Sequence, residues 1–143
     1  MPPRTERLTF TPLSIAALEA LLAGDRGRLQ AVAGAIFPDP LAAPPEMADA
    51  LPVMRDALRD DPASAAWGPF LMVLRETGQA AGSAGFFARP DAAGTLILGD
   101  SVYPSHQRRG LASEAAAALV DWALAQPGIA QVQATIPPRH IAS

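Results

Sequence analysis

The segment Gln107-Arg108-Arg109-Gly110-Leu111-Ala112-Ser113 leads from a predicted strand, through one tight turn, into a predicted helix rich in alanine. The first four backbone N–H groups of a helix have no partner within it, and the helix dipole adds positive potential at that end. Gly110 allows a ligand to approach the backbone closely, and Ala112 leaves space beside it. Arg108 and Arg109 add cations that can reach phosphate oxygens. The turn therefore fits a diphosphate, although a solvated arginine loop before an amphipathic helix would show the same spacing.

An antiparallel meander is predicted upstream of this turn. Residues 70–74 are apolar enough for a buried strand, residues 76–79 form a hairpin turn, and residues 80–87 form the returning strand. After another turn, residues 95–103 form the next strand, in which Gly99 is expected to mark a bulge. Antiparallel pairing follows because the connections are short.

A crossover is predicted downstream of the meander. Residues 111–125 place apolar side chains on one helical face, and residues 129–136 form a last strand. A strand, helix and strand joined in this way lie parallel, so the strand at 129–136 should pair in parallel with the strand at 95–103.

The N-terminal part adds a strand and several helices. Residues 8–11 alternate like a strand, and Ser14 caps a helix that Gly24 ends. Residues 27–36 allow a further helical turn, and residues 50–60 predict a helix. The side chains of this last helix expected to face inward are Val53, Met54, Ala57 and Leu58.

Composition limits the function classes. A chain of 143 residues with 50% hydrophobic residues fits one globular domain. The net charge of -3 argues against nucleic acid as the main partner, and no run approaches the roughly 18 apolar residues of a membrane span. Cysteine is absent, which excludes disulfides and a cysteine nucleophile. The sequence therefore predicts a protein of the cytoplasm without nucleic-acid or membrane partners.

Residues 99–115 resemble the acetyl-CoA signature of the GNAT superfamily of N-acetyltransferases. That signature pairs a Gln/Arg-x-x-Gly-x-Gly/Ala turn, filled here by Gln107, Gly110 and Ala112, with a strand that ends in Val-x-Pro, filled by Val102 and Pro104. The opening Arg-Leu strand, the Gly-Ser-Ala-Gly-Phe strand and the Ala-Ser-Glu-Ala helix start are most similar to the branch that acetylates the N-terminal alanine or serine of ribosomal proteins. The resemblance covers nearly the whole chain.

This resemblance implies a fold and a cosubstrate. The expected fold is α+β, an α/β/α sandwich formed by one domain over residues 1–143, whose mostly antiparallel sheet contains a central splayed strand pair. The expected reaction transfers an acetyl group from acetyl-CoA, without a metal, to a primary amine of a protein N-terminus or a small molecule. The residues expected to bind the cofactor are Ser101, Val102, Gln107, Arg108, Arg109, Gly110, Leu111, Ala112, Ser113 and His140.

The catalytic residues are less well specified. Relatives often carry Glu two residues before Gly99, where this chain has Ile97. Asp100 is a candidate general base, although it also fits a strand-end carboxylate. The resemblance implies that Ser143 either caps the next helix or assists at the leaving thiol. His106, beside the turn, titrates near neutral pH but fits a surface histidine better.

Several further alternatives remain open. Glu114 fits either a helix-capping role or binding of the substrate amine, and Trp67, Phe86, Phe87 and Trp122 fit core aromatics better than an acceptor cage. The family's final helix and hairpin have no counterpart before Ser143, so a truncated sequence, or a homodimer that pairs through an exposed strand edge, is expected. A non-catalytic acyl-CoA-binding module and an inactive fragment are the alternative functions.

Overall fold

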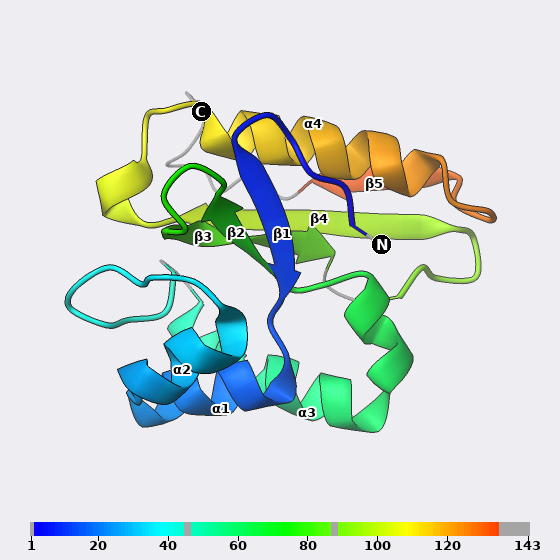
Figure 1. The fold of residues 1–143 in the computed structure, drawn as a ribbon. Coiled ribbons are helices and arrows are strands. Elements are labelled where there is room, and N and C mark those ends of the chain that lie inside the picture. The colour runs from blue at the N-terminus through cyan, green and yellow to red at the C-terminus, as the bar shows by residue number, and fades with distance from the viewer. Residues whose placement is uncertain (1, 45–46, 87–88, 135–143) are drawn as a thin grey trace.

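A computed structural model describes residues 2–44, 47–86 and 89–134 of the chain (Figure 1). In chain order, its strands and longer helices are β1 (Leu8–Pro12), α1 (Ile15–Ala23), α2 (Arg26–Ala33), α3 (Leu51–Asp60), β2 (Phe70–Leu74), β3 (Ala80–Phe86), β4 (Thr95–Val102), α4 (Leu111–Leu124) and β5 (Gln131–Ala134). Short 3₁₀ turns are η1 (Ala48–Ala50), η2 (Pro62–Ala66) and η3 (Pro104–His106). The predicted order of strand, helices, meander, helix and strand is confirmed, and the further turn after α1 is a full helix, α2.

The strands form a five-stranded sheet in the order β1-β2-β3-β4-β5. β1 to β4 pair antiparallel, and β4 pairs with β5 in parallel, from Thr95 opposite Gln131 to Leu98 opposite Ala134. The predicted meander and parallel crossover are therefore confirmed. β4 continues to Val102, past the last described residue of β5, so the expected splay of this pair lies outside the described residues.

The bulge predicted at Gly99 is wrong for the β3–β4 pair. The register runs without a shift from Gly82 opposite Val102 to Phe86 opposite Leu98. Gly99 lies opposite Gly85, so two glycines face each other and no extra residue is inserted. The register shift instead lies between Met72 and Val73 of β2.

Helices cover both faces of the sheet. Figure 1 shows α4 on one face and α1, α2 and α3 on the other. The buried residues of α4 recur every fourth position, at Leu111, Ala115, Leu119 and Ala123, so one stripe of the helix packs on the sheet. Trp122 of α4 packs together with Trp67 and Phe86, with ring centroids 5.4 to 6.3 Å apart. This arrangement is the expected α/β/α sandwich. Phe86 is buried in its core, and Trp67 and Trp122 are partly buried and pack against that core.

The inward face predicted for α3 is partly wrong. Leu51 and Leu58 are buried and Met54 packs against the same core, but Val53 is 68% exposed and Ala57 is also exposed. At 100° per residue, Val53 lies about 200° from Leu51 around the helix, on its opposite side. The buried stripe therefore follows Leu51 rather than Val53.

Caps at α1 agree with the sequence. The Ser14 hydroxyl accepts a hydrogen bond from the Ala17 N–H (3.2 Å), and Gly24 ends the helix in the left-handed conformation. Both positions confirm the predicted start and end of this helix.

Candidate functional site

The site candidate is the connection from β4 to α4. After Val102 the chain passes through η3 and then a turn that enters α4 at Leu111. The Gln107 side-chain amide donates a hydrogen bond to the Val102 carbonyl (3.0 Å), which closes this connection on itself. Gln107 therefore shapes the turn through its side chain.

The backbone of the turn has two residues with positive φ. Gly110 has a φ of 75° and Arg108 has a φ of 64°, the only described non-glycine residue with positive φ. Such a conformation costs a residue with a Cβ about 1–2 kcal/mol. Strained backbone persists where the surrounding structure holds it, and it gathers at ligand sites. The positive φ of Arg108 therefore marks this turn as a candidate ligand site independently of its sequence.

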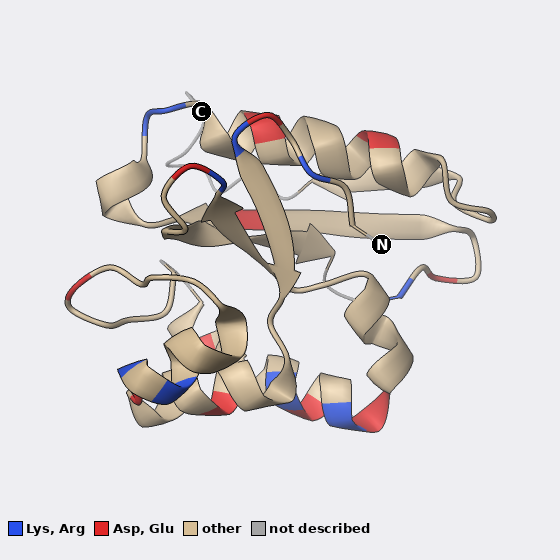
Figure 2. Cartoon of the chain, in the orientation of Figure 1, with Lys and Arg blue, Asp and Glu red and all other residues tan. Residues whose placement is uncertain are grey.

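The turn presents donors and cations to solvent. Arg108, Arg109 and Gly110 are exposed, and α4 begins without a side-chain cap at Gly110. The first N–H groups of a helix need an acceptor from outside the helix, and an anion supplies one. Figure 2 shows basic residues in the loop before α4, whereas the layer formed by α1, α2 and α3 contains both acidic and basic residues. A local anion site is therefore possible on a chain with net negative charge.

A pocket of about 360 Å³ lies beside the turn. It is formed by the loop after α2, the start of β3, and the connection from β4 to α4, with lining residues Ile36, Phe37, Pro38, Asp39, Gln79, Ala80, Ser105, His106 and Arg109. The Ile36 N–H donates to the Gly78 carbonyl and the Ala80 N–H to the Ile36 carbonyl (2.9 and 2.7 Å), so backbone bonds hold the loop in place. Sequence analysis did not find this pocket, because its walls come from separate parts of the chain.

His106 is buried, so its interpretation as a surface histidine is wrong. Its exposed fraction is 6%, and its Nδ1 and Nε2 lie 2.8 Å from the Ser105 hydroxyl and 3.3 Å from the Gln79 side-chain oxygen. A neutral imidazole that accepts at Nδ1 and donates from Nε2 satisfies both bonds. Burial, and then the nearby Arg109 cation, lower the pKa of His106 below its usual 6.5.

This lowered pKa predicts a pH dependence of stability. Below about pH 6.5, His106 binds a proton in the unfolded chain but less readily in the folded chain, because its folded pKa is lower. The folded state therefore loses stability as the pH falls. Urea unfolding of the variant His106→Gln, at a series of pH values, should show a flatter decrease between about pH 7 and pH 5. A slope equal to that of the parent protein would contradict the role of His106.

The expected catalytic and pantetheine residues lie along the end of β4. Asp100 is opposite Ala84 and Ser101 is opposite Ser83 in the β3–β4 register. Because side chains alternate along a strand, Asp100 lies on the same face of β4 as Leu98, which is buried and packs with α4. Ile97 lies on the opposite face, and its side chain is 42% exposed. Asp100 and Ser101 therefore lie next to each other on β4, upstream of the turn before α4, whereas His140 and Ser143 lie outside the described residues.

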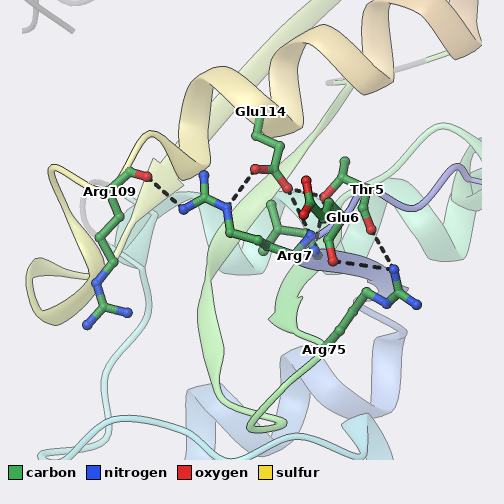
Figure 3. Close-up of polar contacts among 7 residues, drawn as sticks. Thr5, Glu6, Arg7, Arg75, Arg109 and Glu114 are labelled. Carbon is green, nitrogen blue, oxygen red and sulfur yellow. Dashed lines mark hydrogen bonds and ion pairs between the residues drawn. The ribbon is translucent and has the colours of Figure 1, made fainter.

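Glu114 has partners that sequence analysis missed. Figure 3 shows its carboxylate facing the segment before β1. The carboxylate accepts hydrogen bonds from the Thr5 hydroxyl and from the Arg7 backbone N–H (3.1 Å). It also forms an ion pair with Arg7 Nε (2.7 Å). Partial burial tends to raise the pKa of Glu114, but the hydrogen bonds from Thr5 and Arg7 outweigh it and leave the pKa below its usual value. Glu114 therefore binds the N-terminal segment, which neither expected role included.

Two kinds of feature are absent from the described residues. None of their helices is long and apolar enough to cross a membrane. Within the same residues, no three His, Asp or Glu side chains gather closely enough to hold a metal ion.

Comparison with known proteins identifies relatives of this fold. A family model described as an acetyltransferase (GNAT) domain matches residues 7–143. YjdG, an uncharacterized N-acetyltransferase of Bacillus subtilis, is 28% identical over 86 residues, which are 60% of this chain and 51% of YjdG. The match therefore spans about half the length of that relative.

Solved structures share the architecture. A GnaT-family acetyltransferase from Bordetella pertussis superposes with a TM-score of 0.65 at 24% identity, covering 99% of this chain and 82% of that one. RimL, a ribosomal-protein acetyltransferase solved in complex with coenzyme A, gives a TM-score of 0.55 at 14% identity, covering 91% of this chain and 71% of RimL. The ribosomal-protein branch is thus one of several groups of structural neighbours. Because the family model spans nearly all of the sequence and includes the turn before α4, the chain belongs to the acetyltransferase (GNAT) domain family.

Proposed function

We propose that this domain binds acetyl-CoA at the turn before α4 and transfers its acetyl group to a primary amine. The observation that carries the proposal is the turn itself, where Arg108 and Gly110 have positive φ and α4 begins without a side-chain cap. RimL, which shares the fold, was solved with coenzyme A. Family membership, the shape of the turn and its exposed cations all support the same ligand.

The residues present fit the diphosphate of such a ligand. Gly110 has no side chain, Ala112 has only a methyl group, and the guanidinium groups of Arg108 and Arg109 are exposed. Under the proposal, backbone N–H groups from Arg108 to Ser113 bind the diphosphate, and the backbone of Ser101 and Val102 binds the pantetheine arm. The cofactor therefore lies along the end of β4 and the start of α4.

The chemistry requires alignment and removal of a proton. Acetyl-CoA supplies the acetyl group as a thioester; the amine nitrogen bonds to its carbonyl carbon while the C–S bond breaks, giving an amide and the thiol of coenzyme A. The acceptor enters as an ammonium group; one proton leaves it before the attack, and we assign the removal of that proton to the carboxylate of Asp100, directly or through a water. A second proton leaves the nitrogen as the amide forms and goes to the departing thiolate. The rest of the site aligns the reactants, which by itself provides a large part of the acceleration. The acceptor is a protein N-terminus or a small amine.

A second candidate function is binding of an acyl-CoA without catalysis. It is favoured by Ile97, an apolar residue 42% exposed on β4 where relatives often carry glutamate. Both functions need the same phosphate turn. They differ only in turnover.

Calorimetry and turnover test these proposals in order. We expect acetyl-CoA to bind with a dissociation constant of roughly 1 µM to 1 mM, and the folded protein to release coenzyme A thiol from acetyl-CoA with at least one member of a panel of N-terminal peptides and small amines. Binding without turnover across the panel would favour the non-catalytic module. Absence of binding by the folded chain would contradict both functions and favour an inactive fragment.

A further inference from the structure

We propose that Arg7 is a positioning residue for the turn at residues 107–110, here called the phosphate turn. Arg7 holds this turn in the conformation that binds coenzyme A. The inference rests on the proposed function, because it concerns the coenzyme A site. Figure 3 shows the Arg7 side chain between Glu114 of α4 and the backbone of Arg109. Neither partner is near Arg7 in the sequence, being 107 and 102 residues away.

The Arg7 guanidinium bridges the two sides of the turn. Its Nη1 donates to the Arg109 carbonyl (2.9 Å) and its Nε to the Glu114 carboxylate (2.7 Å). A Cβ added to Gly110 would lie 3.6 Å from Arg7 Nη2, so the guanidinium is also beside that glycine. A single planar group thus contacts the turn before α4 and the first turn of α4 itself.

The bond to the Arg109 carbonyl sets the direction of an amide in the turn. A peptide group is planar and trans, so the C=O of Arg109 and the N–H of Gly110 point in opposite directions. With the carbonyl bound to Arg7, the Gly110 N–H points away from Arg7. Without Arg7, the peptide group between Arg109 and Gly110 could rotate, because glycine changes easily from a positive φ to other backbone conformations. Arg7 therefore fixes in advance the orientation of an amide that the proposed diphosphate needs.

The ion pair also removes an unfavourable charge from the site. Glu114 lies in the first turn of α4, where its carboxylate would repel a diphosphate bound at the same helix end. Arg7 and Thr5 both donate to this carboxylate and thereby hold it on the side of the N-terminal segment. Glu114 thus helps to anchor the turn, and the Arg7 cation compensates the negative charge of its carboxylate.

The segment that carries Arg7 is itself fixed to the sheet. The Arg75 N–H donates to the Arg7 carbonyl (2.8 Å), and the Arg75 guanidinium donates to the carbonyls of Thr5 (2.9 Å) and Glu6 (3.4 Å). The next residue, Leu8, opens β1 opposite Leu74 of β2. Arg7 therefore links the turn before α4 to the β1 edge of the sheet, as a positioning role requires.

The variant Arg7→Ala tests this inference in the full chain. We expect the dissociation constant of coenzyme A and the KM for acetyl-CoA to rise about tenfold, with kcat within about twofold of the parent value. S-acetylpantetheine, which lacks the diphosphate, should react with unchanged kcat/KM. Arg7→Lys, which keeps the charge but cannot bridge both partners, should lose nearly as much coenzyme A affinity.

A matched control is Arg59→Ala. Arg59 is 50% exposed and pairs with Glu19 at 3.2 Å on the opposite helical layer, whereas Arg7 is 44% exposed and pairs with Glu114 at 2.7 Å. The control should leave coenzyme A affinity unchanged. Equal affinity of parent and Arg7→Ala, or an equal loss toward S-acetylpantetheine, would overturn the inference, and Arg7→Lys decides the question if the alanine variant fails to fold. A parent protein that binds no coenzyme A would contradict the proposed function itself and the inference with it.

Discussion

Replacement of Gly110 by valine is expected to abolish measurable binding of acetyl-CoA, with a loss of at least about 100-fold in affinity, while the domain stays folded. Gly110 has a φ of 75°, which a β-branched residue adopts only at a cost of about 1–2 kcal/mol. The added Cβ meets no atom of the described structure closer than 3.6 Å, so it adds no steric clash to this backbone strain. Valine would instead cover the backbone at the point where the diphosphate must approach, and would pull the turn toward negative φ. Calorimetric titration with acetyl-CoA measures the affinity.

The control for this substitution is Gly24→Val. Gly24 ends α1 with a φ of 68°, and a Cβ there meets nothing within 4 Å, so the backbone strain is comparable. Both variants should lose a similar free energy of unfolding in urea, but only the change at Gly110 should remove acetyl-CoA binding. Unchanged affinity in the Gly110 variant would refute the assignment of this turn to the diphosphate.

Much of this fold follows from local sequence patterns. Each of these patterns lies within a short stretch of sequence. The structure confirms the strands and turns predicted within residues 70–103, the cap at Ser14 and the glycine that ends α1. The parallel pairing of β4 with β5 followed from the crossover rule without any side-chain detail. The sequence also locates the turn before α4, because all of its residues are consecutive, whereas its binding of a diphosphate stays a prediction.

The features missed by sequence analysis depend on contacts between distant segments. The Arg7–Glu114 pair joins residues 107 apart, and nothing near either one predicts the other. The sequence predicts a surface position for His106, yet Gln79 and the loop after α2 lie against it. The sequence predicts an inward position for Val53, although Leu51 sets the buried face of α3. Tertiary packing decided each of these positions.

The variant Asp100→Asn is expected to lower kcat about 100-fold near neutral pH, because a positioned general base contributes roughly 10²–10⁴ to the rate. Asparagine has nearly the same shape and cannot take a proton at neutral pH. Asp100 lies on β4, two residues before Val102, so it follows the proposed path of the pantetheine arm. The KM for acetyl-CoA should therefore change little, since the diphosphate turn is untouched. Steady-state kinetics with saturating acceptor measures both parameters.

The pH profile separates proton removal from a structural role of Asp100. A free α-amino group has a pKa of about 8, so a peptide acceptor loses its proton to solvent as the pH rises. If Asp100 removes that proton, the deficit of the asparagine variant should shrink steadily above about pH 8. If Asp100 only supports the strand, the deficit should stay constant at every pH. Asp121→Asn, which changes an exposed carboxylate on α4, serves as the control and should keep the parent profile. A pH-independent deficit, or full activity of Asp100→Asn, would exclude Asp100 as the base.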